Sequence, residues 1–322
     1  AGQGIDIEHE MTTLTMRIVT KTLFDVDLSD DTDDIGATVT EVFEITNRRF
    51  NRLMAIPRWL PTRENRTMKV AVAKLDSIVH RFIDEWRKTG VDKGDLLSML
   101  LLAMDDDDGS GMSDRQVRDE ALTLFVAGHE TTANTLIWVW YLLSQHPEIE
   151  ARLHAELESV LGARQATFAD LDKLVYTEMV IKEAMRLYPP AYLVTRDANE
   201  DIQIGGYDIP RGLPVGVNIY GMHHDARFFP DPERFDPERF SAENEKHIQK
   251  YAYVPFGAGP RVCIGNSFAM MEAKLIVATL ARRFTLSHAP NHIAEPTRVF
   301  TMRPKYGMEM IAHPRALEAI RE

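Results

Sequence analysis

One long apolar helical stretch, residues 113–144, constrains the fold of this chain more than any other feature. Ser113 and Gln116 form a capping-box pattern at its start, and Pro147 marks the start of the next helix. A helix of ~31 residues measures roughly 47 Å. From Leu122 to Leu143 apolar side chains cover nearly its whole circumference, which is typical of a helix buried on all sides.

A stretch of this length and apolar character is also long enough to cross a membrane. Its interior, however, contains His129, Glu130 and Asn134. Charged and strongly polar side chains are costly at the centre of a bilayer. We therefore expect a helix buried inside a protein core rather than a membrane span.

The remaining pattern divides at Pro189-Pro190. Before that point, amphipathic periodicity predicts further helices over 7–26, 35–53, 64–89, 95–104, 147–161 and 174–188. After it, short alternating runs predict strands near 192–197, 201–204, 214–219, 284–287, 299–303 and 307–312, with Gly205-Gly206 as a turn. The sequence predicts a mainly α fold with a small β part. We expect one domain over residues 1–322, helical over 1–190 and mixed over 191–322.

Composition excludes several classes of function. The chain has a single cysteine, which rules out an internal disulfide framework and a four-cysteine zinc or iron–sulfur site. A lone cysteine also fits a reducing compartment. The formal net charge of −12 argues against a nucleic-acid partner, because such proteins carry clustered Lys and Arg.

The cysteine lies in the segment Phe256-Gly257-Ala258-Gly259-Pro260-Arg261-Val262-Cys263-Ile264-Gly265, directly before an apolar run expected to be helical from Ile264. Glycines allow a flat cofactor to approach the backbone closely. A helix N-terminus stabilises a thiolate. The alternative is a buried structural cysteine, the commonest fate of a lone one. The spacing of the glycines and Arg261 favours a thiolate ligand to haem instead.

This spacing resembles that of the cytochrome P-450 family of haem-thiolate monooxygenases. Three other stretches match in the family's order: Ala127–Thr132, Glu183–Arg186 and Pro237–Phe240. The match runs from about residue 7 to the end. It implies the cytochrome P-450 fold, incomplete at the N-terminus, with haem b as cofactor.

The resemblance implies a role for each matched residue. Cys263 would be the axial ligand of the haem iron. The other residues expected at the haem are Arg261, Phe256, Gly257, Gly265, Arg196, Ala127 and Gly128. Arg261 and Arg196 would pair with the propionates. The alternative for Arg196 is a surface arginine without such a partner.

Glu130 and Thr131 form a candidate acid–alcohol pair that delivers protons to bound dioxygen. The alternative for Thr131 is a hydroxyl bonded back to its own helix. We expect His129 to be a packed histidine rather than a catalyst.

Glu183 and Arg186 stand at i, i+3 on one helix and can form an ion pair. The resemblance implies that both are buried with Arg239. We expect these three to be structural and to hold the 225–256 loop, so that the cysteine loop presents its sulfur.

The substrate pocket is expected from the resemblance alone. Its candidate residues are Phe125, Ala191, Tyr192, Leu193, Val194, Phe300 and Thr301. Most of them are apolar, which favours an apolar small-molecule substrate.

The expected function is insertion of one atom of O2 into such a substrate, by hydroxylation or epoxidation. Electrons would come from a separate ferredoxin or flavin reductase that docks near Cys263, with Lys250 and Arg282 as candidate contacts. The alternatives are a haem-thiolate peroxygenase or isomerase, which usually lacks the acid–alcohol pair, and a non-catalytic haem-binding fragment.

The chain begins with Ala-Gly-Gln-Gly and not with Met. Since family members carry about 100 or more further residues before the first helix, we expect an N-terminal part to be missing. The expected location is the cytoplasm, with an N-terminal membrane anchor as the alternative. We also expect residues 1–322 alone to bind haem poorly or to aggregate.

Overall fold

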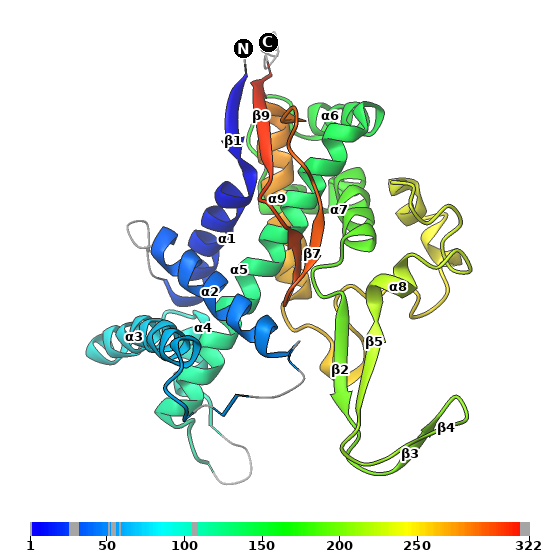
Figure 1. Ribbon diagram of the computed structural model, residues 1–322. Helices are drawn as coiled ribbons and strands as arrows, with labels where there is room; N and C mark the ends of the chain where they lie inside the picture. The colour runs from blue at the N-terminus through cyan, green and yellow to red at the C-terminus, as the bar shows by residue number, and fades with distance from the viewer. Residues whose placement is uncertain are drawn as a thin grey trace. The chain divides into compact units, whose positions relative to one another are not determined.

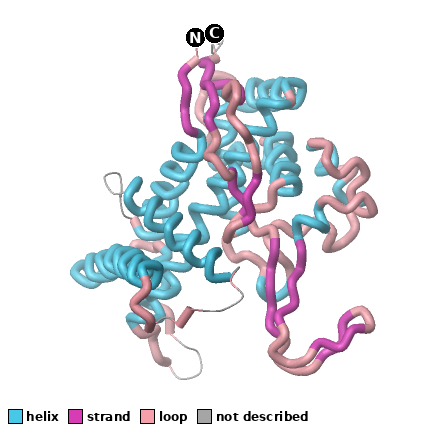
Figure 2. The backbone as a smooth tube through the Cα atoms, in the orientation of Figure 1, coloured by secondary structure: helices cyan, strands magenta, loops and turns pink. Residues whose placement is uncertain are grey.

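The computed structural model describes residues 2–25, 32–50, 52, 56–57, 59–104 and 109–315. These residues are mainly helical with small antiparallel sheets, which confirms the predicted fold class (Figures 1 and 2). The chain divides into two compact units, Ala1–Ile7 with Asn134–Glu322, and Glu8–Ala133. The division falls within helix α5 (Asp114–Gln145).

Among the residues described, the regular elements of the unit Glu8–Ala133 are helices, and one isolated β-bridge joins Met104 and Gly111. The unit comprises α1 (Ile7–Phe24), α2 (Thr32–Phe50), α3 (Arg63–Thr89), α4 (Leu96–Leu102) and the first part of α5. Its core contains the ring of Phe24, whose centroid lies 5.5 Å from that of Phe82 and 6.5 Å from that of Phe125. These contacts join α1, α3 and α5.

Local signals fix the ends of these helices. Thr62 caps α3 by accepting a hydrogen bond from the Asn65 N–H at 3.1 Å. Gly90 ends the same helix in the left-handed region, with φ 61°. Before α5, the Ser113 N–H donates to Gln116 Oε1 (2.9 Å), and the Gln116 N–H donates to Ser113 Oγ (3.4 Å). The predicted capping box is therefore present.

The second unit contains both helices and sheets. Its helices are α6 (Pro147–Leu161), α7 (Val175–Leu187), α8 (Ile219–His223), α9 (Asn266–Arg283) and the last part of α5. Helix α7 packs against α6 and α9. On α5, Trp138 and Trp140 are fully buried, and the ring of Trp138 stacks on Tyr188 with centroids 4.0 Å apart. Among the residues described, no helix combines the length and apolar character needed to cross a membrane.

The strands of this unit pair antiparallel (Figure 1). One sheet has three strands, in the order β1 (Gln3–Asp6), β9 (Glu309–Pro314), β6 (Phe284–His288). The other sheets have two strands each. They pair β2 (Leu193–Asp197) with β5 (Pro214–Asn218), β3 (Ile202–Ile204) with β4 (Tyr207–Ile209), and β7 (Pro296–Arg298) with β8 (Met302–Pro304). Gly205 and Gly206, with φ 58° and 88°, form the turn of the β3–β4 hairpin. Two positive φ values match the twist of a two-residue hairpin.

The main differences from the sequence prediction concern strands. We expected residues 1–190 to be helical, but β1 lies at the start of the chain and pairs with β9, for example Gln3 with Ala312. A four-residue strand whose partner is this distant has no local signal. The predicted strand at 299–303 is displaced to 302–304, where it pairs with the unpredicted β7. Residues 26, 51 and 53 of the predicted helices lie outside the described residues.

Candidate active site

Cys263, the sole cysteine of the chain, has an exposed side chain and a free thiol. It lies between a short 3-10 helix, η4 (Gly259–Arg261), and α9. Its backbone N–H donates to the carbonyl of Phe256 (N···O 2.9 Å), and the Val262 N–H donates to the carbonyl of Gly259 (3.0 Å). These two bonds close the loop that carries the sulfur.

Glycines give this loop its shape. Gly257 and Gly259 have φ 72° and 73°, in the left-handed region that other residues adopt only at a cost. A Cβ placed on Gly265 would lie 3.9 Å from Cys263 Sγ, in van der Waals contact. Glycine at position 265 therefore leaves space beside the sulfur.

The helix after the cysteine begins later than we expected. Its first residue is Asn266, with Gly265 at the N-cap, so the expected start at Ile264 is wrong. Ile264 continues the apolar pattern of the helix, but its side chain is 89% exposed. The apolar pattern in the sequence begins before the helix itself. Gly265, at the N-cap, separates Ile264 from the helix, but a single glycine is only a weak sign of a helix boundary.

The surroundings of Cys263 fit a flat, largely apolar metal complex. Val262 and Ile264, on either side of it, both expose apolar side chains. Within the described ranges, no group of three or more His, Cys, Asp and Glu residues is placed to hold a metal ion. A single soft thiolate between exposed aliphatic groups suits a metal that brings its own ring of ligands, as haem iron does.

Two arginines of the same unit are accessible to an anion. Arg261 is exposed at the end of η4, and no hydrogen bond or ion pair of its side chain is found with the described residues. Arg196, on β2, is exposed and donates through Nη1 to the carbonyl of Thr195 (2.7 Å). Because a guanidinium has five N–H donors, both retain donors for a carboxylate.

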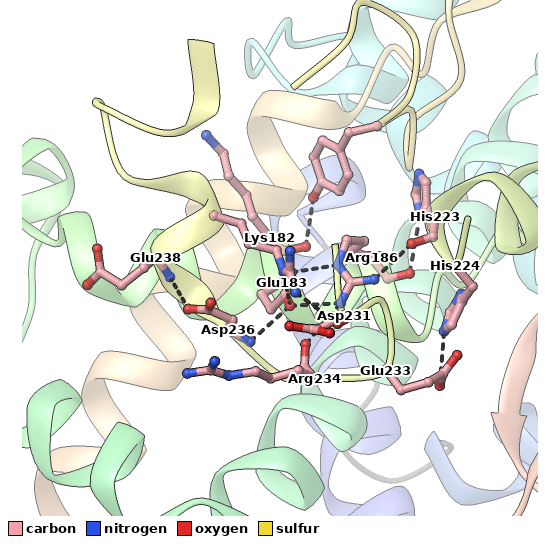
Figure 3. Close-up of polar contacts among 12 residues, drawn as sticks. Lys182, Glu183, Arg186, His223, His224, Asp231, Glu233, Arg234, Asp236 and Glu238 are labelled. Atoms are coloured by element: carbon pink, nitrogen blue, oxygen red, sulfur yellow. Dashed lines mark hydrogen bonds and ion pairs between the residues drawn. The ribbon is translucent and has the colours of Figure 1, made fainter. Parts of the chain in front are cut away.

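Helix α7 carries a buried ion pair (Figure 3). The side chains of Glu183 and Arg186 are both 0% exposed. The guanidinium donates through Nε and Nη2 to the two carboxylate oxygens, each at 2.8 Å. Burial raises the pKa of Glu183, against the opposing effect of Arg186. Arg186 also donates to the carbonyls of His223 (2.8 Å) and Arg234 (3.1 Å), so it makes four hydrogen bonds in all.

Arg239 reaches the same carboxylate from the 3-10 helix η2 (Pro237–Phe240). Its Nε lies 3.4 Å from Glu183 Oε1, and its Nη2 donates to the carbonyl of Asp231 (2.9 Å). The Asp236 N–H also donates to Glu183 Oε1 (2.9 Å). The structure thus brings Glu183, Arg186 and Arg239 together and ties η2 to α7. Their support of the cysteine loop stays a prediction.

The acid–alcohol pair lies on α5 within the unit Glu8–Ala133. Glu130 is buried, and Thr131 Oγ1 donates to the carbonyl of Ala127 (2.8 Å). The helix-bonded hydroxyl that we considered as the alternative is therefore the state present here. A hydroxyl that donates in this way can still accept a hydrogen bond through its lone pairs. A Cβ on Gly128 would come within 3.1 Å of Val19 Cγ2, so α1 packs closely at this point.

His129 is a packed core residue. It is 0% exposed, its Nδ1 lies 2.8 Å from the carbonyl of Phe125, and its own carbonyl accepts from Thr15 Oγ1 (3.0 Å). Burial lowers its pKa, so the ring is neutral near pH 7. The side chain of Phe125, expected at the substrate pocket, is buried beside it, with ring centroids 5.2 Å apart.

The other candidate pocket residues lie in two segments that are side by side in the second unit. The Tyr192 hydroxyl donates to the carbonyl of Val299 (3.1 Å), and the Met302 N–H donates to the carbonyl of Pro190 (3.0 Å). Leu193 and Phe300 are exposed, Ala191, Tyr192 and Val194 are half-buried, and Thr301 is buried. The segments 190–194 and 299–302 therefore form one partly open apolar strip.

The expectation for Arg282, a candidate contact for the electron-transfer partner, is wrong. We expected Arg282 on the surface near Cys263, but it is only 5% exposed. Its guanidinium donates to the carbonyls of Ala163 and Arg164, just after α6. It is therefore a buried link between helices. Lys250 is exposed.

Sequence reasoning missed His223, which contacts both Arg186 and the cysteine loop. Its Nε2 accepts a hydrogen bond from the Val254 N–H (3.1 Å). It occupies no periodic position and belongs to none of the matched stretches. Its contacts come from segments distant in sequence, so the only local sign was the adjacent pair His223-His224.

Comparison with known proteins supports this description. The protein-family model for cytochrome P-450 matches residues 1–310. The chain is 41% identical over 292 residues to cyclooctat-9-en-7-ol 5-monooxygenase of Streptomyces melanosporofaciens, covering 90% of this chain and 63% of that protein. It is 33% identical over 319 residues to pentalenene oxygenase of Streptomyces avermitilis, covering 98% and 68% respectively.

Solved structures agree with the fold. The crystal structure of the cytochrome P450DA heme domain superposes with a TM-score of 0.88 at 28% sequence identity. It covers 98% of this chain, which in turn matches 69% of that one. The chain thus spans about two thirds of the length of the relatives it matches, 63% in the first case and 68% in the second.

Proposed function

Because this chain belongs to the cytochrome P-450 family, we propose that it forms the haem-binding part of a monooxygenase. The observation that carries the proposal is the exposed, free thiol of Cys263, held in a glycine-shaped loop before α9. Haem with a thiolate ligand is the cofactor of this family, and we propose haem b here. The whole protein would insert one atom of O2 into an apolar organic substrate.

The cysteine loop would hold the cofactor through three features. Cys263 Sγ binds the iron, and the absence of a side chain at Gly265 leaves room beside it. Val262 and Ile264 offer exposed apolar contacts to the ring. Arg261 and Arg196 bind the propionates through their available N–H donors. When bound, haem supplies the reductive activation of O2, which the side chains of this chain do not provide.

The acid–alcohol pair on α5 would control protons. The side chain of Glu130 is buried, and this residue is next to Thr131 in the sequence. The proton on Thr131 Oγ1 is held by the carbonyl of Ala127 at 2.8 Å. Rotation about the Cα–Cβ bond releases this proton toward a nearby acceptor, and Glu130 then replaces it. The Glu130 side chain is buried, whereas the hydrogen bond between Thr131 and Ala127 is exposed.

The substrate class follows from the apolar strip and from the relatives. Leu193 and Phe300 expose apolar side chains on the strip formed by 190–194 and 299–302. The names of two relatives specify cyclooctat-9-en-7-ol and pentalenene. We infer an unsaturated, largely hydrocarbon substrate of this kind. Electrons would come from a separate ferredoxin or flavin reductase, and the cytoplasmic location stays a prediction.

A haem-thiolate peroxygenase or isomerase remains the second candidate. It would keep the same cysteine loop but would not need a proton-delivering pair. Glu130 and Thr131 stand together at the expected position on α5, which favours the monooxygenase. Strict dependence of product formation on O2 and reductant distinguishes the two.

The experiment that tests the ligand uses the ferrous–carbonyl spectrum of the full-length protein. We expect a strongly red-shifted Soret band, as thiolate ligation produces, and its loss in Cys263→Ser. Ser267→Ala, an exposed position in the first turn of α9, is the matched control and should keep the band. A wild-type spectrum without this band would end the proposal. Titration with pentalenene and cyclooctat-9-en-7-ol, followed by the Soret shift, tests the substrate class.

A further inference from the structure

His223 lies at the end of α8 beside the buried ion pair (Figure 3), and it also contacts Val254, which precedes the cysteine loop. It is 0% exposed. Its Nε2 lies 3.1 Å from the Val254 backbone nitrogen, and its Nδ1 lies 3.3 Å from the carbonyl oxygen of Arg186. Its own carbonyl accepts from Arg186 Nη1 (2.8 Å). His223 and Arg186 therefore hold each other through two hydrogen bonds.

These contacts fix one protonation state of the ring. A backbone N–H only donates, so Nε2 must be an unprotonated acceptor toward Val254. A backbone carbonyl only accepts, so Nδ1 carries the proton toward Arg186. Burial lowers the pKa of His223 to about 3, with the nearby Arg186 cation acting in the same direction. The ring is thus neutral, in the Nδ1–H form, and links two segments in a defined direction.

The segment held by Val254 leads directly to the sulfur. The Gly257 N–H donates to the Val254 carbonyl (3.0 Å), and the Cys263 N–H donates to the Phe256 carbonyl (2.9 Å). The residue before this turn, Tyr253, stacks on His223 with ring centroids 5.2 Å apart. A continuous series of contacts therefore runs from Arg186 through His223 and the turn at 254–257 to the backbone of Cys263.

We propose that His223 is a positioning residue for the thiolate ligand. Its neutral ring fixes the start of the cysteine loop to the Glu183–Arg186 ion pair, and the loop in turn fixes the direction of the sulfur. The proposal rests on haem ligation by Cys263. It assigns to His223 a function that the three residues Glu183, Arg186 and Arg239 do not provide, because none of them makes a hydrogen bond to residues 254–263 in the part of the chain described.

Two substitutions separate the bonds of His223. His223→Gln places an amide oxygen near the position of Nε2, so it can still accept from Val254. His223→Asn is shorter and can donate to Arg186, but it does not reach Val254. His224 provides the matched control, because it is the next residue, has a half-buried ring that stacks on Tyr220 at 4.0 Å, and makes no hydrogen bond to the loop among the residues described. His224→Asn should behave like the wild type.

The readouts are hydrogen exchange and spectroscopy on the haem-loaded, full-length protein. In His223→Asn we expect the Val254 amide to exchange about fivefold faster or more, as expected for loss of one hydrogen bond. The share of the ferrous–carbonyl complex with the red-shifted thiolate band should fall, and the neutral-thiol form should grow. His223→Gln should restore both. Equal, wild-type behaviour of the Asn and Gln variants would overturn the proposal, and so would equal losses in His224→Asn.

A measurement without substitution covers the case in which the Asn variant does not fold. Nitrogen NMR of the diamagnetic ferrous–carbonyl protein reports the tautomer of each histidine. We expect the ring of His223 to be in the Nδ1–H form. Its NMR signal is identified as the one that is absent from the spectrum of His223→Gln. An Nε2–H ring or an imidazolium near pH 7 contradicts the proposed contact. If the wild type itself shows no thiolate band, the function assigned to Cys263 fails, whereas the exchange and tautomer results still decide whether His223 holds Val254.

Discussion

At the scale of single residues, the hydroxyl of Thr131 combines a local structural contact with a proposed catalytic role. It is bonded to the Ala127 carbonyl at 2.8 Å, which is a contact within its own helix turn. We therefore expect Thr131→Ala to fold normally but to uncouple electron consumption from product formation. Thr131→Ser keeps the hydroxyl and should remain largely coupled. The measurement is the amount of product formed per electron consumed in the wild type and both variants. An unchanged ratio in Thr131→Ala would contradict the proposed role.

The carboxylate of Glu183 is half of the buried ion pair on α7. Its side chain is 0% exposed and accepts from Arg186 and Asp236. Glu183→Gln would leave the Arg186 cation buried without its counter-charge, which we expect to lower the free energy of unfolding by ~3–5 kcal/mol. The adjacent Lys182 forms a partly exposed ion pair with Glu245 at 3.0 Å, so Lys182→Met should cost less than about 1 kcal/mol. Urea unfolding measures both, and similar losses in the two variants would argue against this ranking.

The contact between two residues close in the sequence could be predicted, and contacts between remote segments could not. Glu183 and Arg186 are three positions apart on one helix, so their pairing could be predicted from spacing alone. His223 acts through Arg186 and Val254, which lie 37 and 31 positions away. Arg282 was wrongly expected to be exposed. The two carbonyls that bind its guanidinium belong to the segment after α6, which is 118 and 119 positions away in the sequence. Such contacts appear only when the chain is folded.

At the scale of elements, helix ends depend on local chemistry that a single substitution can remove. Gly90 ends α3 with φ 61°, and its N–H donates to the Trp86 carbonyl (2.8 Å). A side chain in this left-handed conformation costs ~1–2 kcal/mol, so Gly90→Ala should destabilise by about that amount. Gly4 is a suitable control, since a Cβ there meets nothing within 4 Å and its φ is not positive. Thermal unfolding should show a lower midpoint for Gly90→Ala only, and equal midpoints would contradict the assigned cap.

Elements whose ends carry a local sequence signal could be predicted, and elements that depend on a remote partner could not. Helices α3 and α6 begin and end within one residue of the prediction, because Thr62, Gly90 and Pro147 are local signals. Strand β1 has no such signal. It forms because β9, from the far end of the described chain, offers a free edge. The β3–β4 turn was predictable because Gly205-Gly206 is itself a hairpin signal.

At the scale of the whole molecule, buried histidines make the stability depend on pH. Burial lowers the pKa of His223 from 6.5 to about 3 and that of His154 from 6.5 to about 4. At pH values between the folded and unfolded pKa, the unfolded chain binds protons that the folded chain does not. The stability contributed by these neutral rings is therefore fully present above pH 6.5 and decreases as the pH falls toward 4.

Two carboxyls, Glu183 and Glu150, act in the opposite direction, because burial raises the pKa of each. Burial raises the pKa of Glu150 from 4.5 to about 6, so the folded chain binds this proton first as the pH falls. This group favours the folded state below pH 6. Its shift is smaller than that of either His223 or His154. The histidines should therefore determine the sign of the pH dependence.

We accordingly expect the urea concentration at the unfolding midpoint of the full-length protein to decrease as the pH is lowered from about 7.5 to about 5. His129, His154 and His223 all have pKa values lowered by burial, and replacing His154 with Gln removes one of them, so the fall should become smaller. His247→Gln, at an exposed position, should leave the fall unchanged. His154 is preferred to His223 for this test because it lies on α6, away from the cysteine loop. A midpoint that rises toward pH 5 would show that the two carboxyls outweigh the histidine rings. Such a result would also weaken the case for a neutral His223, because the acid sensitivity and the Val254 hydrogen bond depend on the same unprotonated Nε2.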